Sequence, residues 1–364
     1  MYKFFLFLAL SVLFVSCSKE ERVIEDTPSY GRDIVPPVGF EINMISDLEP
    51  FGRPISFQFF GEQTGYTLYS TDIGGFANVR KTIDRGEEWR STGVRNRVFP
   101  SGMAFADENF GVVTGYQLDC PSGSPCKRSA VILRTENGAT DWELITIEEL
   151  EGELLYPKFD DEGNLYANFL FNDLQSKLMK STDNGDTWEV LLDTLGLRFN
   201  SYANNIRHEY EIIQDYIYVV GEQGRIFVVN TNGDLIETLS IPNSQITKLH
   251  AIDKNHLIAS VQDQALSRLV RSNDGGQTWE MIYDNPGLPI GFDSPEKGLL
   301  ILGSGPPSPI SSDLVASTND GGQTWIKAER ESLNLLNTFA GSQKIENGRW
   351  LFIVNNELVE IKEE

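Results

Sequence analysis

The chain is poor in the residues from which most metal and catalytic sites are built. Its 364 residues include three histidines and three cysteines. The histidines His208, His250 and His256 do not follow a metal-ligand spacing. The sequence also lacks a G-x-S-x-G motif, a Walker loop and a Rossmann fingerprint. We therefore expect no bound metal and no cofactor, and no motif designates a catalytic residue.

Basic residues are also scarce. The chain has 30 lysines and arginines against 53 aspartates and glutamates, which gives a formal net charge of −23 at pH 7. Such a surface repels the phosphate backbone of nucleic acids and anionic lipid headgroups, and it favours solubility. We therefore exclude nucleic acid as a partner and expect a monomer.

The N-terminal apolar run is too short to cross a bilayer. Phe4–Val15 contains twelve apolar or small residues, whereas a spanning helix needs about 20. Lys3 precedes this run and Ser16-Cys17 follows it. This arrangement predicts a signal peptide over residues 1–16.

The residues around Cys17 resemble a bacterial lipobox, with Phe14 in place of the usual leucine. The resemblance implies lipidation of Cys17, so the polar, proline-containing residues 17–38 are predicted to form a flexible lipidated tether. The following "SKEE" (Ser18–Glu21) resembles the Bacteroidetes-type lipoprotein export signal, which implies an outer membrane lipoprotein exposed at the cell surface. As a generic acidic tether, the same residues leave the periplasmic face of that membrane open. The expected membrane contact is through the lipid anchor only.

The other two cysteines lie in "DCPSGSPCK". In an oxidising cell envelope we expect Cys120 and Cys126 to form a disulfide. Closing so short a loop would contribute about 2 kcal/mol. A redox or metal-binding role is the alternative, although the spacing is not C-x-x-C and the segment has no nearby histidine.

Five similar segments end in tryptophan, and we call them tryptophan turns. They are "KTIDRGEEW", "RTENGATDW", "KSTDNGDTW", "RSNDGGQTW" and "STNDGGQTW", closing at Trp89, Trp142, Trp188, Trp279 and Trp325. Their positions differ by 53, 46, 91 and 46 residues, so the third gap is about twice the others. A degenerate copy at Val228–Glu237 fills that gap but has lost the tryptophan.

Two alternating runs joined by a short turn precede the tryptophan turns, as in Ile55–Tyr69, Gly102–Tyr116 and Ile290–Gly303. Period-2 alternation bounded by Gly, Asp or Asn predicts two strands joined by a turn. With the third strand and the strand after the tryptophan, one unit holds four antiparallel strands in about 45 residues. That is the size of a propeller blade.

Six units run from Ile55 to Trp325, and Lys344–Lys362 begins a seventh. The outer strand that this last unit lacks is assigned to Gly39–Asp47. We therefore predict an all-β fold over residues 39–364: a seven-bladed β-propeller of four-stranded antiparallel blades, closed by the N-terminal strand. Six and eight blades are the alternatives.

The tryptophan turns resemble the Asp-box, or bacterial neuraminidase repeat, with the pattern S-x-D-x-G-x-T-W. Three copies match closely, the copy at Trp89 keeps most positions, and the copy at Trp142 is read with Glu136 for the aspartate and one inserted residue. Asp and Ser or Thr side chains bond nearby backbone amides, and glycine permits positive φ. We interpret these residues as structural: Asp84, Trp89, Asp183, Trp188, Asp274, Trp279, Asp320 and Trp325.

The resemblance to Asp-box propellers also implies that ligands bind on the face opposite these turns. Loops assigned to that face are long in blades 1, 2 and 6 and short in blade 4. Two connections between blades carry arginine beside aromatic residues, which suits carboxylates or sugar rings. The candidate binding residues there are Arg95, Arg97, Phe99, Arg198 and Tyr202, with Phe199 beside them. Solvated surface arginines are the alternative reading.

Sialidases carry Asp-boxes, an arginine triad, a Tyr–Glu nucleophile pair and an N-terminal F/Y-R-I-P segment. The nearest counterpart of that segment is "FGRPIS", in which Arg53 follows an inserted glycine and Pro54 comes directly after it. Arg53 therefore joins the candidate binding residues, but the triad has no counterpart that the spacing identifies. Glycoside hydrolysis needs two facing carboxylates, and no spacing designates them.

The strand and turn pattern also resembles photosystem II assembly-factor-like propellers and the sortilin ectodomain, which implies binding of proteins or peptides. The favoured hypothesis is therefore a non-enzymatic cell-envelope lipoprotein whose propeller binds protein or glycan. The alternative is a glycan-cleaving enzyme with carboxylates in the central cleft.

Overall fold

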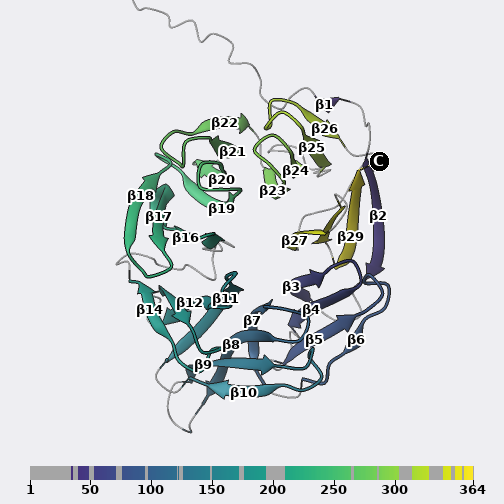
Figure 1. Cartoon of the computed structure of the whole chain (residues 1–364), viewed down its shortest axis with the longest axis vertical. Helices are drawn as coiled ribbons and strands as arrows, with labels where there is room; N and C mark the ends of the chain where they lie inside the picture. Colours follow the sequence, from purple (N-terminus) through teal and green to yellow (C-terminus); the bar gives the residue numbers. More distant parts are fainter. Residues whose placement is uncertain are drawn as a thin grey trace, which may run out of the picture.

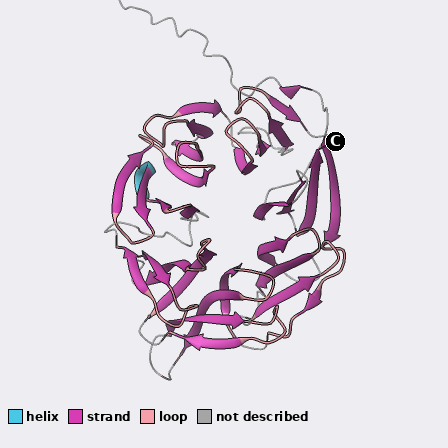
Figure 2. Cartoon of the chain, in the orientation of Figure 1, coloured by secondary structure: helices cyan, strands magenta, loops and turns pink. Residues whose placement is uncertain are grey.

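The computed structural model of the chain describes residues 34–35, 40–48, 53–70, 76–94, 97–120, 122, 126–147, 150–171, 176–193, 210–263, 266–284, 287–302, 314–327, 339–345, 349–354 and 356–363. In these residues the regular structure is β-strand, apart from one 3-10 helix at Glu222–Gly224 (Figure 2). The described part of the chain contains no helix long and apolar enough to span a bilayer. The predicted signal peptide and most of the tether fall outside the described residues.

Seven sheets, each built on four antiparallel strands, stand around a ring, so the fold is a seven-bladed β-propeller (Figure 1). Blade 1 is β3 (Arg53–Phe60), β4 (Thr64–Ser70), β5 (Ala77–Thr82) and β6 (Arg90–Ser91). Blade 2 is β7 (Phe99–Phe105), β8 (Gly111–Asp119), β9 (Lys127–Thr135) and β10 (Glu143–Thr146). Blade 3 is β11 (Gly152–Phe159), β12 (Leu165–Phe171), β13 (Ser176–Ser181) and β14 (Glu189–Leu192). Blade 4 is β15 (Tyr210–Ile213), β16 (Tyr216–Val220), β17 (Arg225–Asn230) and β18 (Leu235–Ser240). Blade 5 is β19 (Gln245–Ala251), β20 (Leu257–Asp263), β21 (Leu266–Ser272) and β22 (Glu280–Tyr283). Blade 6 is β23 (Gly287–Phe292), β24 (Gly298–Leu302), β25 (Leu314–Thr318) and β26 (Trp325–Lys327), and blade 7 is β27 (Phe339–Ile345), β28 (Arg349–Val354), β29 (Glu357–Glu363) and β2 (Phe40–Asp47).

Both termini build blade 7, as the sequence predicts. The N-terminal strand β2 pairs antiparallel with the C-terminal strand β29, from Phe40 opposite Glu363 to Asp47 opposite Glu357. Leu48, which directly follows β2, is fully buried, and its N–H donates to the Asn356 carbonyl at 2.6 Å. The ring is therefore closed by strand pairing between the two ends of the propeller, residues 40–47 and 357–363.

A further N-terminal strand was not expected from the sequence. β1 (Ile34–Val35) lies inside the segment that reads as a tether, and it pairs in parallel with β26 at the outer edge of blade 6 (Figure 1). Ile34 is opposite Trp325 and Val35 is opposite Ile326. Blade 6 therefore has five strands, and the chain passes over its outer edge before it closes blade 7.

Strand order defines two faces of the ring. In blades 1 to 6 the chain enters at the innermost strand and moves outward through four antiparallel strands (Figure 1). Blade 7 follows the same order from β27 to β29, and the N-terminal strand β2 completes it. The hairpins after the first strand and the tryptophan turns after the third lie on one face, which we call the turn face. The loops after the second strand and the connections between blades lie on the other, which we call the loop face.

The innermost strands tolerate proline because each is the inner edge of its sheet. Pro54, Pro100, Pro157 and Pro289 lie in β3, β7, β11 and β23. An edge position spares the missing N–H from a ladder bond. Next to each proline the pairing register with the second strand shifts, which marks a β-bulge.

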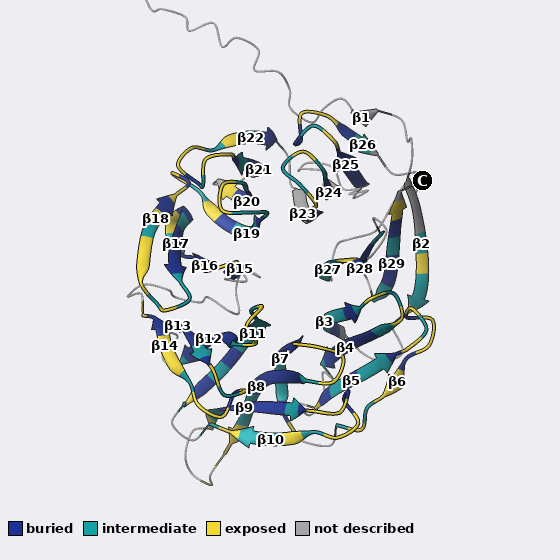
Figure 3. Ribbon diagram, in the orientation of Figure 1, coloured by how far each residue is buried: buried dark blue, intermediate teal, exposed yellow. Residues whose placement is uncertain are grey.

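The core lies between blades rather than inside any one of them. Tyr66 and Leu68 of blade 1, for example, pack with Val113 and Leu133 of blade 2, and all four are fully buried. Burial is highest on the middle strands and falls toward the outer ones (Figure 3). A single blade has no core of its own, so stacking around the ring supplies it.

Polar side chains on four inner strands also bond the backbone of the next blade's inner strand. The pairs are Gln343 with Phe59, Gln58 with Phe105, Lys158 with Tyr210 and His250 with Phe292. The Gln343 amide donates to the Phe59 carbonyl and accepts from the Phe59 N–H, both at 2.7 Å. Between blades 6 and 7 the aligned residue is Gly291, where a Cβ would lie 2.0 Å from the Trp350 ring. The Trp350 indole therefore fills the space between the inner strands of blades 6 and 7, where the four pairs above have a polar side chain bonded to the backbone.

Candidate functional site

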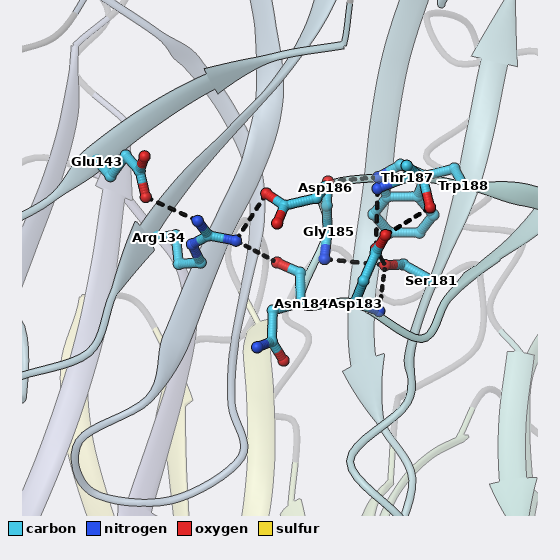
Figure 4. A network of polar contacts seen from close by, with 9 residues as sticks. All are labelled: Arg134, Glu143, Ser181, Asp183, Asn184, Gly185, Asp186, Thr187 and Trp188. Atoms are coloured by element: carbon cyan, nitrogen blue, oxygen red, sulfur yellow. Dashed lines mark hydrogen bonds and ion pairs between the residues drawn. The ribbon is translucent and has the colours of Figure 1, made fainter.

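Each tryptophan turn is a closed hydrogen-bond network, drawn for blade 3 in Figure 4. The Ser181 hydroxyl donates to Asp183 at 2.8 Å and accepts from the Gly185 N–H at 2.9 Å. Asp183 accepts from the N–H and the hydroxyl of Thr187, at 2.8 and 2.6 Å. The turns of blades 5 and 6 repeat these bonds, and the turn of blade 1 repeats most of them.

The turn of blade 2 shows that our sequence alignment there is wrong. Asn137, not Glu136, takes the aspartate position: it accepts from the Asp141 N–H at 2.9 Å and from the Thr135 hydroxyl at 3.1 Å. The turn has no inserted residue, because Ala139 takes the glycine position and its N–H bonds the Thr135 hydroxyl at 3.0 Å. Ala139 adopts the left-handed φ of 67° and is buried. Asn137 and Ala139 thus preserve the hydrogen bonds of the turn, although they do not match the Asp-box pattern.

The carboxylates of these turns are held ionised. The Thr82 hydroxyl and the Glu88 N–H lower the pKa of Asp84. The hydroxyl and N–H of Thr278 lower the pKa of Asp274 in the same way. Hydrogen bonds to the charged form of a carboxylate have this effect. The acceptor oxygens are therefore used inside the turn.

The five tryptophans that close the turns pack against neighbouring blades. Trp325 is fully buried between blades 5 and 6, and Trp89 is 8% exposed between blades 7 and 1. Trp142, Trp188 and Trp279 are half-buried. The Trp89 indole N–H donates to Ser46 of blade 7 at 3.3 Å. The indoles are thus wedges between blades, in addition to packing between strands.

Basic residues just before the turns of blades 1, 2, 3 and 5 join each of these blades to the next. Arg134 of blade 2 donates to the Asn184 carbonyl at 3.4 Å and to Asp186 at 2.8 Å, both in the turn of blade 3 (Figure 4). Lys81, Lys180 and Arg271 reach the carbonyls of Gly138, Thr231 and Gly321 in the same manner. On the turn face, these basic side chains therefore hold neighbouring blades together.

The sequence-predicted binding residues are partly placed by the structure. Arg97 is exposed in the connection between blades 1 and 2, and Phe99 is half-buried at the start of β7. Arg53 is the first residue of β3, opposite Ser70. All three lie at the loop-face ends of their segments. Arg95, Arg198, Phe199 and Tyr202 lie outside the described residues, as do most of the long loops predicted for blades 1 and 6.

Phe99 belongs to a stack of side chains at the loop-face end of blade 2. Its ring lies parallel to that of Tyr116 at 4.9 Å between centroids. The Arg128 guanidinium lies 4.6 Å from the centroid of the Tyr116 ring. Arg128 also pairs with Glu153 of blade 3 at 3.2 Å, and the Ser101 hydroxyl donates to the same carboxyl group. We call Phe99, Tyr116, Arg128 and Glu153 the blade 2 stack.

Burial shapes the charge of this stack. Burial raises the pKa of Glu153, and the Ser101 hydrogen bond and the Arg128 charge act in the opposite direction. The side chains of Arg128 and Glu153 are 26% and 14% exposed. The guanidinium is therefore held between an aromatic face and a carboxyl group, with part of its surface still open to solvent. Such a cation, fixed in advance, suits recognition of an anionic or π-rich group.

The hairpin β8–β9 extends the loop face at the same blade. Both strands have nine residues, and their pairing continues to Asp119 opposite Lys127. Cys120 and Cys126 then form a disulfide with sulfur atoms 2.07 Å apart. Leu118 near the tip is 45% exposed, and Lys127 pairs with Glu151 at 2.7 Å. The hairpin is thus a braced projection that carries both apolar and charged groups.

The described residues contain no group of three or more His, Cys, Asp or Glu side chains arranged to hold a metal ion. The carboxyl group of the blade 2 stack is bonded to a guanidinium and a hydroxyl rather than facing a second carboxylate. This arrangement can orient a ligand by stacking and charge. It does not by itself form the carboxylate pair of a glycoside hydrolase.

Three members of the stack were missed from the sequence. Tyr116 ends an alternating run, and its pairing register places it opposite Phe99. Arg128 follows Cys126 by two residues in "CKRS", so the disulfide loop was the available signal. Glu153 belongs to the next blade, and no local pattern marks it.

The comparisons with known proteins agree with the fold. No model of a known family matches the chain, and no curated protein matches its sequence. The structure of YCF48 bound to D1 peptide has a TM-score of 0.64 and 15% identity, over 92% of this chain and 100% of that one. YCF48 from Cyanidioschyzon merolae has a TM-score of 0.59 and 12% identity, over 89% and 99%. A GH74 xyloglucanase from Xanthomonas campestris has a TM-score of 0.60 and 13% identity, over 88% of this chain and 53% of that one.

At such identities the likeness establishes the β-propeller fold alone. The structures that share it include a protein bound to a peptide and a glycan-cleaving enzyme. The choice between binding and catalysis therefore depends on the residues of this chain.

Proposed function

We propose that the protein is a non-enzymatic binding module that takes a protein or carbohydrate ligand on the loop face. The observation that carries the proposal is the braced hairpin β8–β9 beside the blade 2 stack. Aromatic faces and a fixed guanidinium recognise sugar rings, carboxylates and peptide groups. The peptide-bound YCF48 structure, which shares the fold, supports the binding role.

The contact surface is proposed to include Arg97 and Leu118, which are exposed on either side of the stack. The Gln117 side chain donates to the Arg97 carbonyl at 3.0 Å, so the connection and the hairpin are joined. Rigid elements of this kind lower the entropic cost of ordering a binding surface. Arg53, at the loop-face end of β3, would extend the same face around the ring. The remaining candidates, Arg95, Arg198 and Tyr202, lie outside the described residues.

The test uses fluorescently labelled protein with Cys17 replaced by serine, applied to glycan and peptide arrays. We expect binding to at least one ligand class, weakened about 10-fold or more by R97A and L118A together. R90A is the matched control, because Arg90 is exposed on the outer strand of blade 1 beside the turn face. Binding that R90A abolishes and R97A with L118A leaves intact would refute the proposed surface.

A glycan-cleaving enzyme is the second candidate, and the raised pKa of Glu153 is the observation that favours it. A carboxyl group whose pKa is raised by burial is suited to act as a general acid. Turnover of fluorogenic glycosides that E153Q abolishes would establish this function in place of the first. We expect no such turnover, because the described residues place Arg128 rather than a second carboxylate beside Glu153.

We also propose that Cys17 carries a lipid and anchors the protein to the outer membrane, at the cell surface or on the periplasmic face. The support is the lipobox-like sequence and the acidic residues after it. Metabolic labelling with a fatty-acid analogue should mark the wild type and not C17S. Digestion by proteinase K of intact cells distinguishes the two faces.

A further inference from the structure

The outer edges of the blades differ at one structurally defined position. In each blade of 1 to 6, one outer-strand residue lies opposite the last residue before the turn. This outer-strand residue is charged in blades 1, 2, 3 and 5, where the pairs are Lys81–Arg90, Arg134–Glu143, Lys180–Glu189 and Arg271–Glu280. It is aliphatic in blade 4, with the pair Val229–Leu235, and in blade 6, with the pair Ser317–Ile326. Charge on an edge strand discourages pairing with another strand. Two blades therefore lack this protection.

Blade 6 shows what an aliphatic residue at that position permits. Its outer strand β26 is itself covered by β1, and Val35 lies opposite Ile326. Trp325, which precedes Ile326, is fully buried. In this fold, an outer edge without the charged residue accepts an added strand.

Blade 4 has the same feature but no covering strand among the described residues. Leu235 and Ile236, at the start of β18, are 52% and 51% exposed. β18 is the last strand of its sheet and has a largely exposed surface (Figure 3). The register shift between Val228 and Val229 leaves Ile236 without a cross-strand partner in β17. Two adjacent aliphatic side chains therefore face solvent at an open edge.

The turn before β18 packs against the neighbouring blade. A Cβ on Gly233, in the turn before β18, would lie 2.9 Å from the Leu191 carbonyl of blade 3. We call Leu235 and Ile236 the blade 4 edge patch. Contiguous exposed apolar side chains rimmed by polar ones are typical of interaction sites.

The rim of the patch carries negative charge. Asp234 precedes Leu235, and the Asp215 carbonyl accepts from the Thr231 N–H of the turn before β18. Glu189 of blade 3 lies opposite Lys180. All three acidic residues are exposed. Lys180 also reaches this turn, where its ammonium group donates to the Thr231 carbonyl at 2.9 Å. A net charge of −23 opposes pairing between two copies of the chain. The surroundings therefore favour a partner with basic residues.

We propose that the blade 4 edge patch binds an extended segment of a partner protein that has two adjacent aliphatic residues flanked by basic ones. The segment adds a strand beside β18, as β1 does beside β26. Backbone hydrogen bonds to the open edge give affinity, and the aliphatic and basic side chains give specificity. This surface lies on the outer rim of the ring and is separate from the loop-face site.

The test uses the C17S protein and two fluorescent peptides of equal charge, KKTIVTKK and KKTNSTKK. We expect KKTIVTKK to bind at least about 10-fold more tightly in fluorescence anisotropy. Amide hydrogen exchange at residues 235–240 should slow when KKTIVTKK is added. The second peptide measures the attraction that an acidic protein exerts on any basic peptide.

L235E introduces a charge at the position where blades 1, 2, 3 and 5 have one, and it should weaken KKTIVTKK binding by about 10-fold. The matched control is I83E, because Ile83 is 62% exposed in the turn of blade 1. Both variants add one negative charge, so a loss confined to L235E cannot be electrostatic in origin. Unchanged thermal unfolding shows that both variants fold.

Three results would overturn the proposal. Equal binding of the two peptides would show attraction by charge alone. Equal binding by L235E and the wild type would place the contact elsewhere. A concentration-dependent dimer of the wild type that L235E abolishes would make a second copy of the chain the occupant.

Discussion

At the scale of single residues, His250 occupies the inner-strand position from which Gln58 of blade 1 and Gln343 of blade 7 bond the backbone of the next blade. Its Nε2 atom accepts from the Phe292 N–H at 3.3 Å, which requires the neutral ring. Burial lowers the pKa of His250 below its usual 6.5, and Lys248 and Lys158 act in the same direction, whereas Glu211 opposes them. The neutral imidazole is therefore part of the seam between blades 5 and 6.

This arrangement predicts a loss of stability in acid. Because the folded-state pKa of His250 lies below the unfolded value, the unfolded state binds the proton more readily. The stabilisation is complete above about pH 6.5 and is lost as the pH falls from there through the folded-state pKa. H250Q keeps an acceptor for Phe292, so it should match the wild type at pH 8 and be more stable at pH 5. Chemical unfolding at both pH values checks this, and equal acid sensitivity of the two proteins would contradict it.

Trp325 is predicted to be the tryptophan whose loss costs most. It is fully buried between blades 5 and 6, and its indole nitrogen has no hydrogen-bond partner among the described residues, so its contribution is packing. W325A should therefore lower the free energy of unfolding by about 3–5 kcal/mol. W188A is the comparison, because Trp188 is half-buried and should cost less. Denaturant unfolding that shows equal losses would contradict the wedge role assigned to Trp325.

At the scale of elements, the contacts between neighbouring turns are predicted to matter more than surface ion pairs. The Arg134 side chain is 13% exposed and bonds Asn184, Asp186 and Glu143. Hydrogen bonds that involve charged groups contribute about 1.5–3 kcal/mol. R134A should therefore lower the stability of the protein by about that amount.

The control for R134A is R90A. The Arg90 side chain is 78% exposed and lies 3.7 Å from Glu88, so its loss should cost under about 1 kcal/mol. Thermal unfolding at low and high salt measures both variants. If R134A and R90A unfold at the same temperature, the seam contact does not stabilise the ring.

At the scale of the whole molecule, the N-terminal segment decides whether the ring is closed. A chain that lacks residues 1–38 loses β1 and keeps β2, so it should fold with a modestly lower unfolding temperature. A chain that lacks residues 1–48 also loses β2 and the buried Leu48, which leaves β29 as an open edge. Circular dichroism melts and size-exclusion chromatography should show that the second chain unfolds at a much lower temperature or aggregates. Coincident melts of the two chains would show that β2 is dispensable.

Much of this architecture follows from local sequence patterns. Alternation of period two, the spacing of the tryptophans and the unpaired strand at 39–47 predict seven blades and their closure, because strand pleating and turn hydrogen bonds act within a few residues. Blade 2 shows the limit of such patterns. Asn137 and Ala139 support the same turn as aspartate and glycine, so residue identity misled an alignment that the backbone bonds correct.

What the tertiary structure alone decides is which side chains meet between blades. Arg134 bonds a carbonyl 50 residues away, and Glu153 meets Arg128 across a seam between blades. The pairing of Ile34–Val35 with β26 involves two residues in a segment that reads as a tether. Each of these contacts depends on how finished sheets stack around an axis, and stacking leaves no periodic trace in the sequence. The repeat therefore determines the ring, and the geometry of the ring determines the surfaces at which it can bind.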